Sequence, residues 1–321
     1  MLPTFTYVRP KSVTEALELG ATEGAVLHAG GTDLLGCLRD GVFRAGKVVS
    51  LSALGELRGV ARTSDGGLRI GALTTLSEIA EHATVRGQYL ALAQGAAAAA
   101  SPQLRNQGTI GGNLCQRPRC WYFRGDFHCL RKGGDRCYAV NGDNRYHCIL
   151  GGTACYIVHP SDTAPALVAL GAQVRVASRS GSRLVPIDEF FVPPARSVQR
   201  ENVLRPGDLL TEILLPPASG RSVYRKVRAR GSWDFALAGV AVAATVTEGR
   251  VEQARVVLSG VAPIPWRAAE AEALLTGRQL DADTIGRAAE ASVAGAQPLA
   301  HNGYKIHLVR GLVAETLEAL A

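Results

Sequence analysis

The sequence of 321 residues contains no hydrophobic run long enough to cross a lipid bilayer. Its longest run of small apolar residues, from Gly95 to Ala100 with its flanks, is rich in alanine and far shorter than a membrane-spanning helix requires. The first residues, MLPTFTYVRPKSVTEAL, also lack the apolar core and the small-residue cleavage site of a signal peptide. We therefore expect a soluble protein without an export signal of its own.

A second absence concerns nucleic-acid binding. The net charge of +7 would suit a polyanion, but the basic residues are scattered, and no run rich in arginine and lysine contains interleaved aromatic residues. A basic surface equally suits an acidic partner subunit or an anionic cofactor. With 47% hydrophobic and 20% charged residues, the composition indicates an ordered globular protein, and the length suggests two or three domains.

The common nucleotide-binding motifs GxGxxG and GxxxxGK[ST] are absent, which disfavours a dinucleotide-binding Rossmann fold and a nucleotide hydrolase. Instead, a short apolar strand at residues 25–29 runs into Gly30-Gly31-Thr32-Asp33, and a helix is expected from Leu34. Glycines let the chain turn sharply and bring its amides close to a ligand, and a helix N-terminus favours anions. A pyrophosphate would fit such a turn, although a tight turn without a ligand explains the same residues.

A similar segment, Thr109-Ile110-Gly111-Gly112-Asn113, follows about 80 residues later. Two glycine turns flanked by hydroxyl or amide side chains would clasp a ligand with two phosphates from both sides. The pair is more informative than either turn alone, but it does not identify the ligand.

The cysteines lack the close pairs, about two to four residues apart, that structural zinc sites usually use. Six of the seven lie between Cys115 and Cys155, and the odd total argues against a disulfide framework. Iron–sulfur clusters accept more varied spacing, and many arginines in this stretch would offset the charge of ligating thiolates. Spacing therefore favours an iron–sulfur site over zinc, with free or disulfide-bonded thiols as a third alternative. Cys37 stands alone in an apolar helix and is expected to be a small core residue.

The sequence pattern predicts a small α/β unit over the first 55 residues, a linker at residues 216–220 and an α+β C-terminal domain beyond it. Residues 114–152 lose hydrophobic periodicity and are expected to form a long functional loop. Ahead of the linker we expect helices at residues 12–20 (with Ser12 as its cap), from 34, at 75–79 and at 89–100, a turn at 101–103, and strands at 25–29, 47–51, 68–71, 155–158 and 174–176. Beyond it we expect strands at 222–227, 236–247 and 251–259, then helices at 266–275, 281–294 and 302–320.

Several motifs in order resemble the FAD-binding medium subunits of the xanthine dehydrogenase and carbon monoxide dehydrogenase family of molybdenum hydroxylases. The resemblance implies a two-part FAD-binding domain of the PCMH (vanillyl-alcohol-oxidase-like) type at residues 1–217, with subdomains at about 1–55 and 56–217, and a smaller α+β C-terminal domain of three strands and helices at 221–321. The motifs are Thr4-Phe5-Thr6-Tyr7, Ala29-Gly30-Gly31-Thr32-Asp33-Leu34, Thr109-Ile110-Gly111-Gly112-Asn113-Leu114 and His159-Pro160-Ser161-Asp162.

The cysteine-rich stretch is similar to that of two branches of this family, the flavin subunits of aldehyde oxidoreductases and of 4-hydroxybenzoyl-CoA reductases. Those subunits carry an extra [4Fe–4S] cluster in an insertion, here residues 114–156. Position by position, the resemblance implies that the cluster ligands are Cys120, Cys129, Cys137 and Cys155. Cys115 and Cys148 fall outside that pattern.

The resemblance also implies which residues contact FAD. Asp162 would bind the ribityl chain or, alternatively, cap a helix, while Leu210 and Lys226 would lie near the isoalloxazine ring unless Lys226 forms a surface salt bridge. An alanine run at residues 96–100 stands where xanthine dehydrogenases place an aromatic residue. The second glycine segment would contribute Thr109, Gly112 and Asn113. The segment around the FAD pyrophosphate would comprise Val26, Leu27, His28, Ala29, Gly30, Gly31, Thr32, Asp33 and Leu34.

The implied function is electron transfer. A large subunit with the molybdenum cofactor would oxidise the substrate, a small subunit with [2Fe–2S] clusters would relay electrons to the FAD of this chain, and an external acceptor would receive them. No catalytic acid–base residue is expected here, since the flavin supplies the redox chemistry. Alternatives are a stand-alone FAD oxidase or dehydrogenase of the same fold and a zinc-stabilised scaffold subunit. The expected compartment is the cytoplasm, or the periplasm if a partner with a twin-arginine signal carries the chain.

Overall fold

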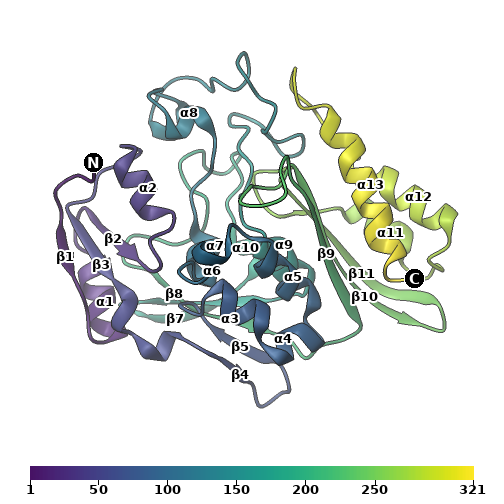
Figure 1. Ribbon diagram of the computed structural model, residues 1–321, viewed down its shortest axis with the longest axis horizontal. Helices are drawn as coiled ribbons and strands as arrows, with labels where there is room; N and C mark the ends of the chain where they lie inside the picture. The colour runs from purple at the N-terminus through teal and green to yellow at the C-terminus, as the bar shows by residue number, and fades with distance from the viewer.

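Three β-sheets organise the chain, and the computed structural model describes all of it, residues 1–321 (Figure 1). The N-terminal sheet is parallel, with the strand order β1-β3-β2. As expected, Ser12 caps the first helix, because its hydroxyl accepts a hydrogen bond from the Glu15 amide at 3.2 Å. The elements are β1 (Thr6–Val8), α1 (Val13–Gly20), β2 (Ala25–His28), α2 (Leu34–Arg39) and β3 (Lys47–Ser50).

The central sheet is antiparallel, with the order β4-β5-β8-β6-β7. Its helices share with it the largest apolar core of the protein. The elements are β4 (Val60–Arg62), β5 (Leu68–Gly71), α3 (Leu76–Glu81), α4 (Ala83–Gln88), α5 (Leu90–Ala98), α6 (Pro102–Arg105), α7 (Ile110–Cys115), α9 (Thr163–Ala169), β6 (Gln173–Ser178), β7 (Gly181–Pro186), α10 (Ile187–Phe190) and β8 (Leu209–Leu215), preceded by the 3-10 turns η1 (Leu51–Ala53) and η2 (Gly55–Leu57).

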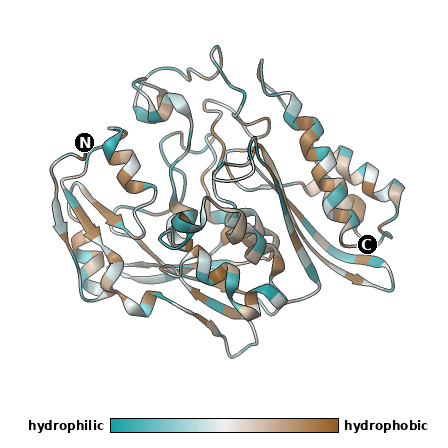
Figure 2. Ribbon diagram, viewed as in Figure 1, coloured by the Kyte–Doolittle hydropathy of each residue, from teal (hydrophilic) through white to brown (hydrophobic).

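The C-terminal sheet, with the order β12-β11-β10-β9, is buried on both faces. Its own helices cover one face, where Val240 and Val242 enter their shared core (Figure 1). On the other face, Ala241 packs into the core of the central sheet near α5 and α9. Figure 2 shows hydrophobic residues along these strands and on the facing helices. The elements are β9 (Arg221–Val227), β10 (Ala238–Thr247), β11 (Arg250–Ser259), β12 (Trp266–Arg267), α11 (Ala269–Leu275), α12 (Ala282–Ala291) and α13 (Tyr304–Glu318).

The expected α+β architecture is confirmed, including the three C-terminal strands and the three helices after them. The two-residue strand β12 occupies the start of the segment expected as the first of these helices. Cys37 is fully buried, as expected of a small core residue. None of the helices combines the length and the apolar character needed to cross a membrane.

Three local expectations are wrong. Residues 101–103 start helix α6 rather than a turn, because the Ser101 hydroxyl caps it and Pro102 suits the first helical position. The second glycine segment is the start of helix α7 rather than a glycine turn. Residues 155–158 form no strand, because the backbone here bonds to other loops. The Tyr156 carbonyl accepts a hydrogen bond from the Cys148 amide, and the amide of the next residue after the segment, His159, donates to the Ala262 carbonyl.

The cysteine-rich segment between α7 and α9 contains only α8 (Trp121–Arg124) and the 3-10 turn η3 (Leu130–Lys132). Its second half is held by the C-terminal domain. The side-chain amide of Asn302 donates to the carbonyls of His147 and Cys148, each at 3.1 Å. The ammonium of fully buried Lys305 donates to the Tyr146 carbonyl at 3.1 Å and to the Gly260 carbonyl at 2.6 Å. Hydrogen bonds thus replace regular structure as the constraint on this loop.

Replacing Asn302 by alanine should lower the free energy of unfolding by about 2–3 kcal/mol, because two buried carbonyls and the Leu299 amide lose their partner. Urea denaturation followed by circular dichroism measures the change. His307→Ala is the matched control: His307 is exposed on α13, the helix that follows Asn302, and should change stability by less than about 0.5 kcal/mol. Equal stability of both variants would contradict the importance of these bonds.

Candidate functional site

The first glycine turn lies between the end of β2 and the start of α2. Gly31 has a left-handed backbone, with φ of 73°, and a Cβ on Gly30 would overlap the carbonyl oxygen of Gln107. Both positions therefore require glycine. None of the amides from Gly30 to Asp33 donates a hydrogen bond within the protein. Four successive N–H groups are left for an anionic ligand, as in the backbone nests that bind phosphate.

The second glycine segment contributes differently. Thr109 caps α7, and its hydroxyl accepts the Gly112 amide at 3.2 Å. The amides of Ile110 and Gly111 donate to the carbonyls of Thr74 and Ala72, in the loop between β5 and α3. These amides are therefore satisfied within the protein. What this segment offers a ligand is the side chain of Asn113, whose amide nitrogen has no partner.

The two glycine segments border two joined cavities. The smaller has a volume of about 260 Å³ and is lined by the first turn, α2 and the start of β8. The larger, of about 440 Å³, reaches from the second segment to the loop between β9 and β10. The residues that line both cavities are Thr32, Asp33, Thr109, Gly112 and Gln116. The glycine segments thus stand at the junction of one extended hollow.

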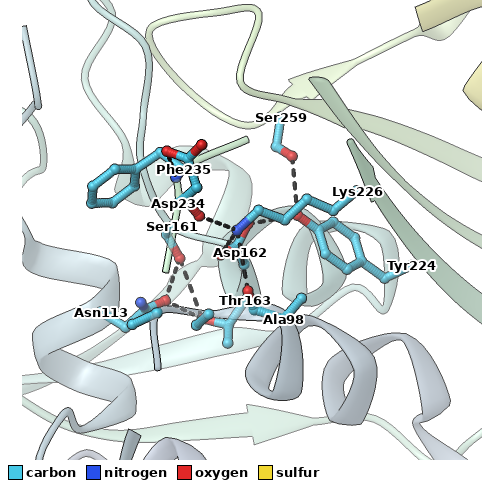
Figure 3. Close-up of polar contacts among 12 residues, drawn as sticks. Ala98, Asn113, Ser161, Asp162, Thr163, Tyr224, Lys226, Asp234, Phe235 and Ser259 are labelled. Atoms are coloured by element: carbon cyan, nitrogen blue, oxygen red, sulfur yellow. Dashed lines mark hydrogen bonds and ion pairs between the residues drawn. The ribbon is translucent and has the colours of Figure 1, made fainter. Parts of the chain in front are cut away.

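A buried ion pair closes the far end of the larger cavity (Figure 3). The carboxylate of Asp162 accepts hydrogen bonds from the Lys226 ammonium and the Tyr224 hydroxyl, both at 2.8 Å. Lys226 also donates to the carbonyls of Ala98 and Asp234. Burial raises the pKa of Asp162, and the Lys226 ammonium and the Tyr224 hydroxyl oppose that rise. Asp162 does not cap α9, and the surface salt bridge considered for Lys226 is wrong.

The side chain of Asn113 is oriented by the hydroxyls of the two residues on either side of Asp162 (Figure 3). Its carbonyl oxygen accepts from Ser161 at 2.5 Å and from Thr163 at 2.7 Å. With the oxygen engaged in this way, the amide nitrogen is free for a ligand in the larger cavity.

Small side chains, and two residues with an uncommon backbone conformation, also line the larger cavity. Ala99 and Ala100 line the larger cavity; they belong to the alanine run that stands where xanthine dehydrogenases place an aromatic residue. Ala100 and Trp233 have φ of 46° and 51°, and both border this cavity. Only one other non-glycine residue has a positive φ. Such backbone conformations gather at functional sites.

The structure divides the expected cofactor residues between the two cavities. Leu210 lines the smaller cavity, and Lys226 lies with Asp162 beside the larger. His28 lines neither cavity. The smaller is lined by Val26, Leu27, Ala29, Gly30, Gly31, Thr32, Asp33, Leu34, Thr109 and Gly112, and the larger by Thr32, Asp33, Thr109, Gly112, Asn113 and Asp162.

Asp33 joins the first glycine turn to the cysteine-rich segment. Its carboxylate pairs with the guanidinium groups of Arg119 and Arg124, both at 2.7 Å, and accepts the Arg117 amide at 2.7 Å. The start of the cysteine-rich segment is therefore fixed at the mouth of the cavities.

Two of the cysteines expected as ligands, Cys120 and Cys137, interact with Cys155, and Cys120 also interacts with Cys129. The thiol of Cys137 donates to the sulfur of Cys155, which lowers the pKa of Cys155 to about 6, and the Arg131 guanidinium acts in the same direction. Cys155 and Cys129 raise the pKa of Cys120, although burial is the larger cause. No three His, Cys, Asp or Glu side chains, however, stand as a set that could hold a metal ion.

The outlying cysteines differ in their surroundings. Cys115 lines the smaller cavity, and burial raises its pKa to about 12. Cys148 lies beside the cysteine group, and burial raises its pKa to about 12. Both thiols therefore stay protonated at neutral pH in the structure described.

Comparison with known proteins identifies the family. Residues 3–218 match the family described as FAD binding domain in molybdopterin dehydrogenase, and residues 222–320 match the CO dehydrogenase flavoprotein C-terminal domain. The chain belongs to the FAD-binding medium subunits of the xanthine dehydrogenase and carbon monoxide dehydrogenase family. The cavities between β2, α7 and the β9–β10 loop thus lie in the FAD-binding domain of this family and at its border with the C-terminal domain.

Individual relatives of this family cover almost the whole chain. The aldehyde oxidoreductase FAD-binding subunit PaoB of Escherichia coli K12 is 38% identical over 98% of this chain and 98% of its own length. The carbon monoxide dehydrogenase medium chain of Hydrogenophaga pseudoflava is 28% identical over 92% of this chain and 88% of its own length. A structure of carbon monoxide dehydrogenase from the same organism superimposes with a TM-score of 0.80 at 26% identity, covering 100% of this chain and 98% of that one.

Several residues at the cavities of this family member were not expected from the sequence. Tyr224 shares a strand face with Lys226, two residues away, and this spacing could have indicated it. Arg119, Trp233 and Phe235 come from loops without periodicity, and no sequence pattern indicated them.

Replacing Lys226 by methionine should destabilise the protein by about 3–5 kcal/mol at neutral pH, because Asp162 is left buried without its cation. Without Lys226, the pKa of the buried carboxyl rises above its unfolded value of about 3.9. The carboxyl then destabilises the fold by an amount that grows as pH rises from the unfolded pKa to the raised folded pKa, stays constant above it, and vanishes below the unfolded pKa. The deficit relative to wild type should therefore shrink between pH 7 and pH 4, as thermal unfolding would measure.

Arg225→Met is the control for this prediction, because Arg225 lies on the same strand and pairs only with exposed Glu315 at 3.6 Å. It should cost less than about 1 kcal/mol, without the pH trend. A deficit of Lys226→Met that is independent of pH would contradict the assignment to Asp162.

Proposed function

We propose that the chain carries FAD and transfers electrons in a molybdenum hydroxylase. A molybdenum-containing large subunit and a [2Fe–2S] small subunit supply the electrons, and an external acceptor takes them. The observation that carries the proposal is the pair of joined cavities with free backbone amides at one end and an ion-paired carboxylate at the other. The names of the relatives support it: they include an FAD-binding subunit of an aldehyde oxidoreductase and one of a xanthine dehydrogenase from Escherichia coli O157:H7.

The residues of the two cavities fit FAD. The free amides from Gly30 to Asp33 suit its pyrophosphate. Each oxygen of Asp162 has a second lone pair that can accept a hydroxyl of the ribityl chain, and the Asn113 amide nitrogen can donate to the same cofactor. Bound FAD supplies two-electron redox chemistry. The protein holds the cofactor, and Lys226 balances the charge of Asp162 so that no net charge is buried there.

A stand-alone oxidase is the weaker alternative. Such an enzyme needs a base that can take a proton from its own substrate. Asp33 and Asp162, the ion-paired carboxylates of the larger cavity, are engaged with cationic side chains. Neither of these two is available as a base, whereas Asp234, the third carboxylate of the cavity, accepts only the Phe235 amide at 2.9 Å. The relatives are named as subunits of larger enzymes, which favours electron transfer over substrate chemistry on this chain.

We extend the proposal to a [4Fe–4S] cluster held by Cys120, Cys129, Cys137 and Cys155. The interactions of Cys155 with Cys120 and Cys137, and of Cys120 with Cys129, support it. So does Arg131, whose side chain is 1% exposed and whose Nε and Nη2 atoms have no hydrogen-bond partner. One nitrogen of Arg131 pairs with Glu201 at 2.6 Å, and its remaining donors beside Cys155 suit a cluster of negative charge. The cluster relays electrons or orders the loop that holds it.

Replacing Gly30 by alanine should lower the affinity for FAD about tenfold or more, because a Cβ would push the amide nest away from the second segment. Absorbance of FAD released from the purified protein measures the change. Gly36→Ala is the matched control, since Gly36 lies in α2 with no atom near its added methyl group. Full FAD content in Gly30→Ala would argue against the nest as the pyrophosphate site.

Replacing Cys129 or Cys137 by serine should abolish most of the bound iron and acid-labile sulfide while leaving FAD bound. Chemical iron analysis and the visible spectrum measure both groups in one sample. Cys37→Ala, which removes a buried thiol far from the cluster in sequence, should keep its iron. Unchanged iron in both serine variants would refute the ligand set, and a colourless protein containing zinc would refute the cluster itself.

A further inference from the structure

The side chain of His147 contacts one of the cysteines proposed as cluster ligands. It belongs to the cysteine-rich segment and is buried. Its Nε2 atom lies 3.3 Å from the sulfur of Cys120, a hydrogen-bonding distance for a sulfur atom. No sequence pattern indicates this contact, because 27 residues separate the two positions. His147 is thus a buried histidine whose contact the proposed function does not use.

The sulfur of Cys120 is surrounded by nitrogen atoms that can donate hydrogen bonds. The backbone amides of Tyr122 and Phe123, in the first turn of α8, also hydrogen-bond to it. A thiolate bound to iron carries no proton, so it accepts hydrogen bonds and cannot donate one. Three nitrogen atoms around one sulfur therefore suit a metal-bound thiolate better than a thiol.

The surroundings of the imidazole determine which of its nitrogens carries the proton. The Nδ1 atom of His147 is buried and has no hydrogen-bond partner. A neutral imidazole has one N–H group, and a buried N–H without an acceptor costs free energy. Beside a thiolate sulfur, the favoured tautomer therefore has its proton on Nε2. A protonated ring has an N–H group on both nitrogens, so Nε2 donates in either state.

The position of the imidazole is fixed by contacts that do not involve the sulfur. The carbonyl of His147 accepts from the side-chain amide of Asn302 at 3.1 Å, and its amide donates to the Asn144 carbonyl at 2.9 Å. Lys305 donates to the carbonyl of the preceding residue at 3.1 Å. The ring of Tyr122 lies beside the imidazole, with centroids 6.1 Å apart. His147 is therefore a donor that is held in place before any cluster binds.

Cys120 is also the expected ligand that adjoins the FAD site. It follows Arg119, whose side chain lines the larger FAD cavity and pairs with Asp33 at 2.7 Å. None of the other three expected ligands is next in sequence to a residue that lines either FAD cavity. A hydrogen bond to this sulfur therefore acts on the ligand that is linked most directly to the flavin site.

Hydrogen bonds to the sulfur atoms of an iron–sulfur cluster change its reduction potential. Reduction adds one electron, so the reduced cluster is the more negative form and is stabilised more by an N–H donor. We propose that His147 is a positioning residue for the [4Fe–4S] cluster, which raises the reduction potential of the cluster by donating a hydrogen bond from Nε2 to the sulfur of Cys120. This inference rests on the proposed cluster.

The test measures this potential in the purified complex with its cofactors, where EPR follows the reduced [4Fe–4S] cluster during a redox titration. His147→Phe keeps a ring but removes the donor. It should lower the potential by the equivalent of about a tenfold change in the reduction equilibrium, which is about 59 mV for a one-electron couple. His147→Gln carries a side-chain N–H that can take the place of Nε2, and it should restore most of the wild-type potential.

His128→Phe is the matched control, because His128 is an exposed histidine of the same segment, one residue before Cys129. Its cluster should have the wild-type potential. A wild-type potential in iron-loaded His147→Phe would overturn the proposal. An equal shift in His128→Phe would also overturn it, since the effect would then come from any change of a histidine in this segment.

A second measurement needs no variant and so does not depend on how well His147→Phe assembles. Pulsed EPR of the reduced wild-type cluster, with histidine labelled by ¹⁵N, should show a coupling to one histidine nitrogen through the N–H···S bond. Absence of this coupling would overturn the proposal and leave the cluster in place. A wild-type complex that contains FAD but no iron would instead refute the cluster, and with it this role of His147, while the FAD-dependent function stands.

Discussion

The buried ion pair between Asp162 and Lys226 is the constraint on which the site depends. Asp162 precedes α9 in the first domain, and Lys226 lies on the first strand of the C-terminal sheet. Neither charge can be left alone at this depth, because an unpaired buried charge costs several kcal/mol. The pairing therefore fixes the C-terminal sheet against α5 and α9. It also sets the depth of the larger cavity, whose wall continues from Asp162 to Ala99 and to the loop after β9.

The cysteine-rich segment is ordered from both ends rather than from within. At its start, three arginines converge on Asp33, so that a residue of the first glycine turn also anchors the segment. At its end, Asn302 and Lys305 of the C-terminal domain bond to its backbone carbonyls. A long connection without regular structure loses much conformational entropy when it folds. These polar anchors offset that loss, and they place Cys120 and Trp121 between the flavin site and the solvent.

The sequence was sufficient for features with a local physical cause. The periodic apolar residues of β10 and α13, the Ser12 cap and the glycines at 30 and 31 follow from side-chain direction, hydrogen-bond geometry and the backbone freedom of glycine. It was insufficient where the outcome depended on distant partners. The amides of Ile110 and Gly111 are satisfied by a loop that no local pattern indicates, so a helix start was read as a second turn. Residues 155–158 are extended and apolar but form no strand, because the nearby backbone bonds to Cys148 and Ala262 instead of to a neighbouring strand.

Family resemblance supplied what physical patterns could not, namely the chemistry of the ligand and the cysteines that share one site. It did not reveal Tyr224, Arg119 or the aromatic rings, because these residues depend on how two loops meet in space. The resemblance assigned Leu210 and Lys226 to the flavin separately. Only the structure shows that Leu210 lines the smaller cavity and that Lys226 lies beside the larger one.

The double burial of the C-terminal sheet has a consequence for how the chain behaves as a folding unit. Alternate residues of β10 belong to two different cores, one shared with the FAD-binding domain and one shared with the C-terminal helices. Melting of either core exposes one face of the same strands, so the two cores are thermodynamically coupled. The FAD-binding domain and the C-terminal domain are consecutive in the sequence, but they therefore unfold as one cooperative unit, and neither is expected to fold independently.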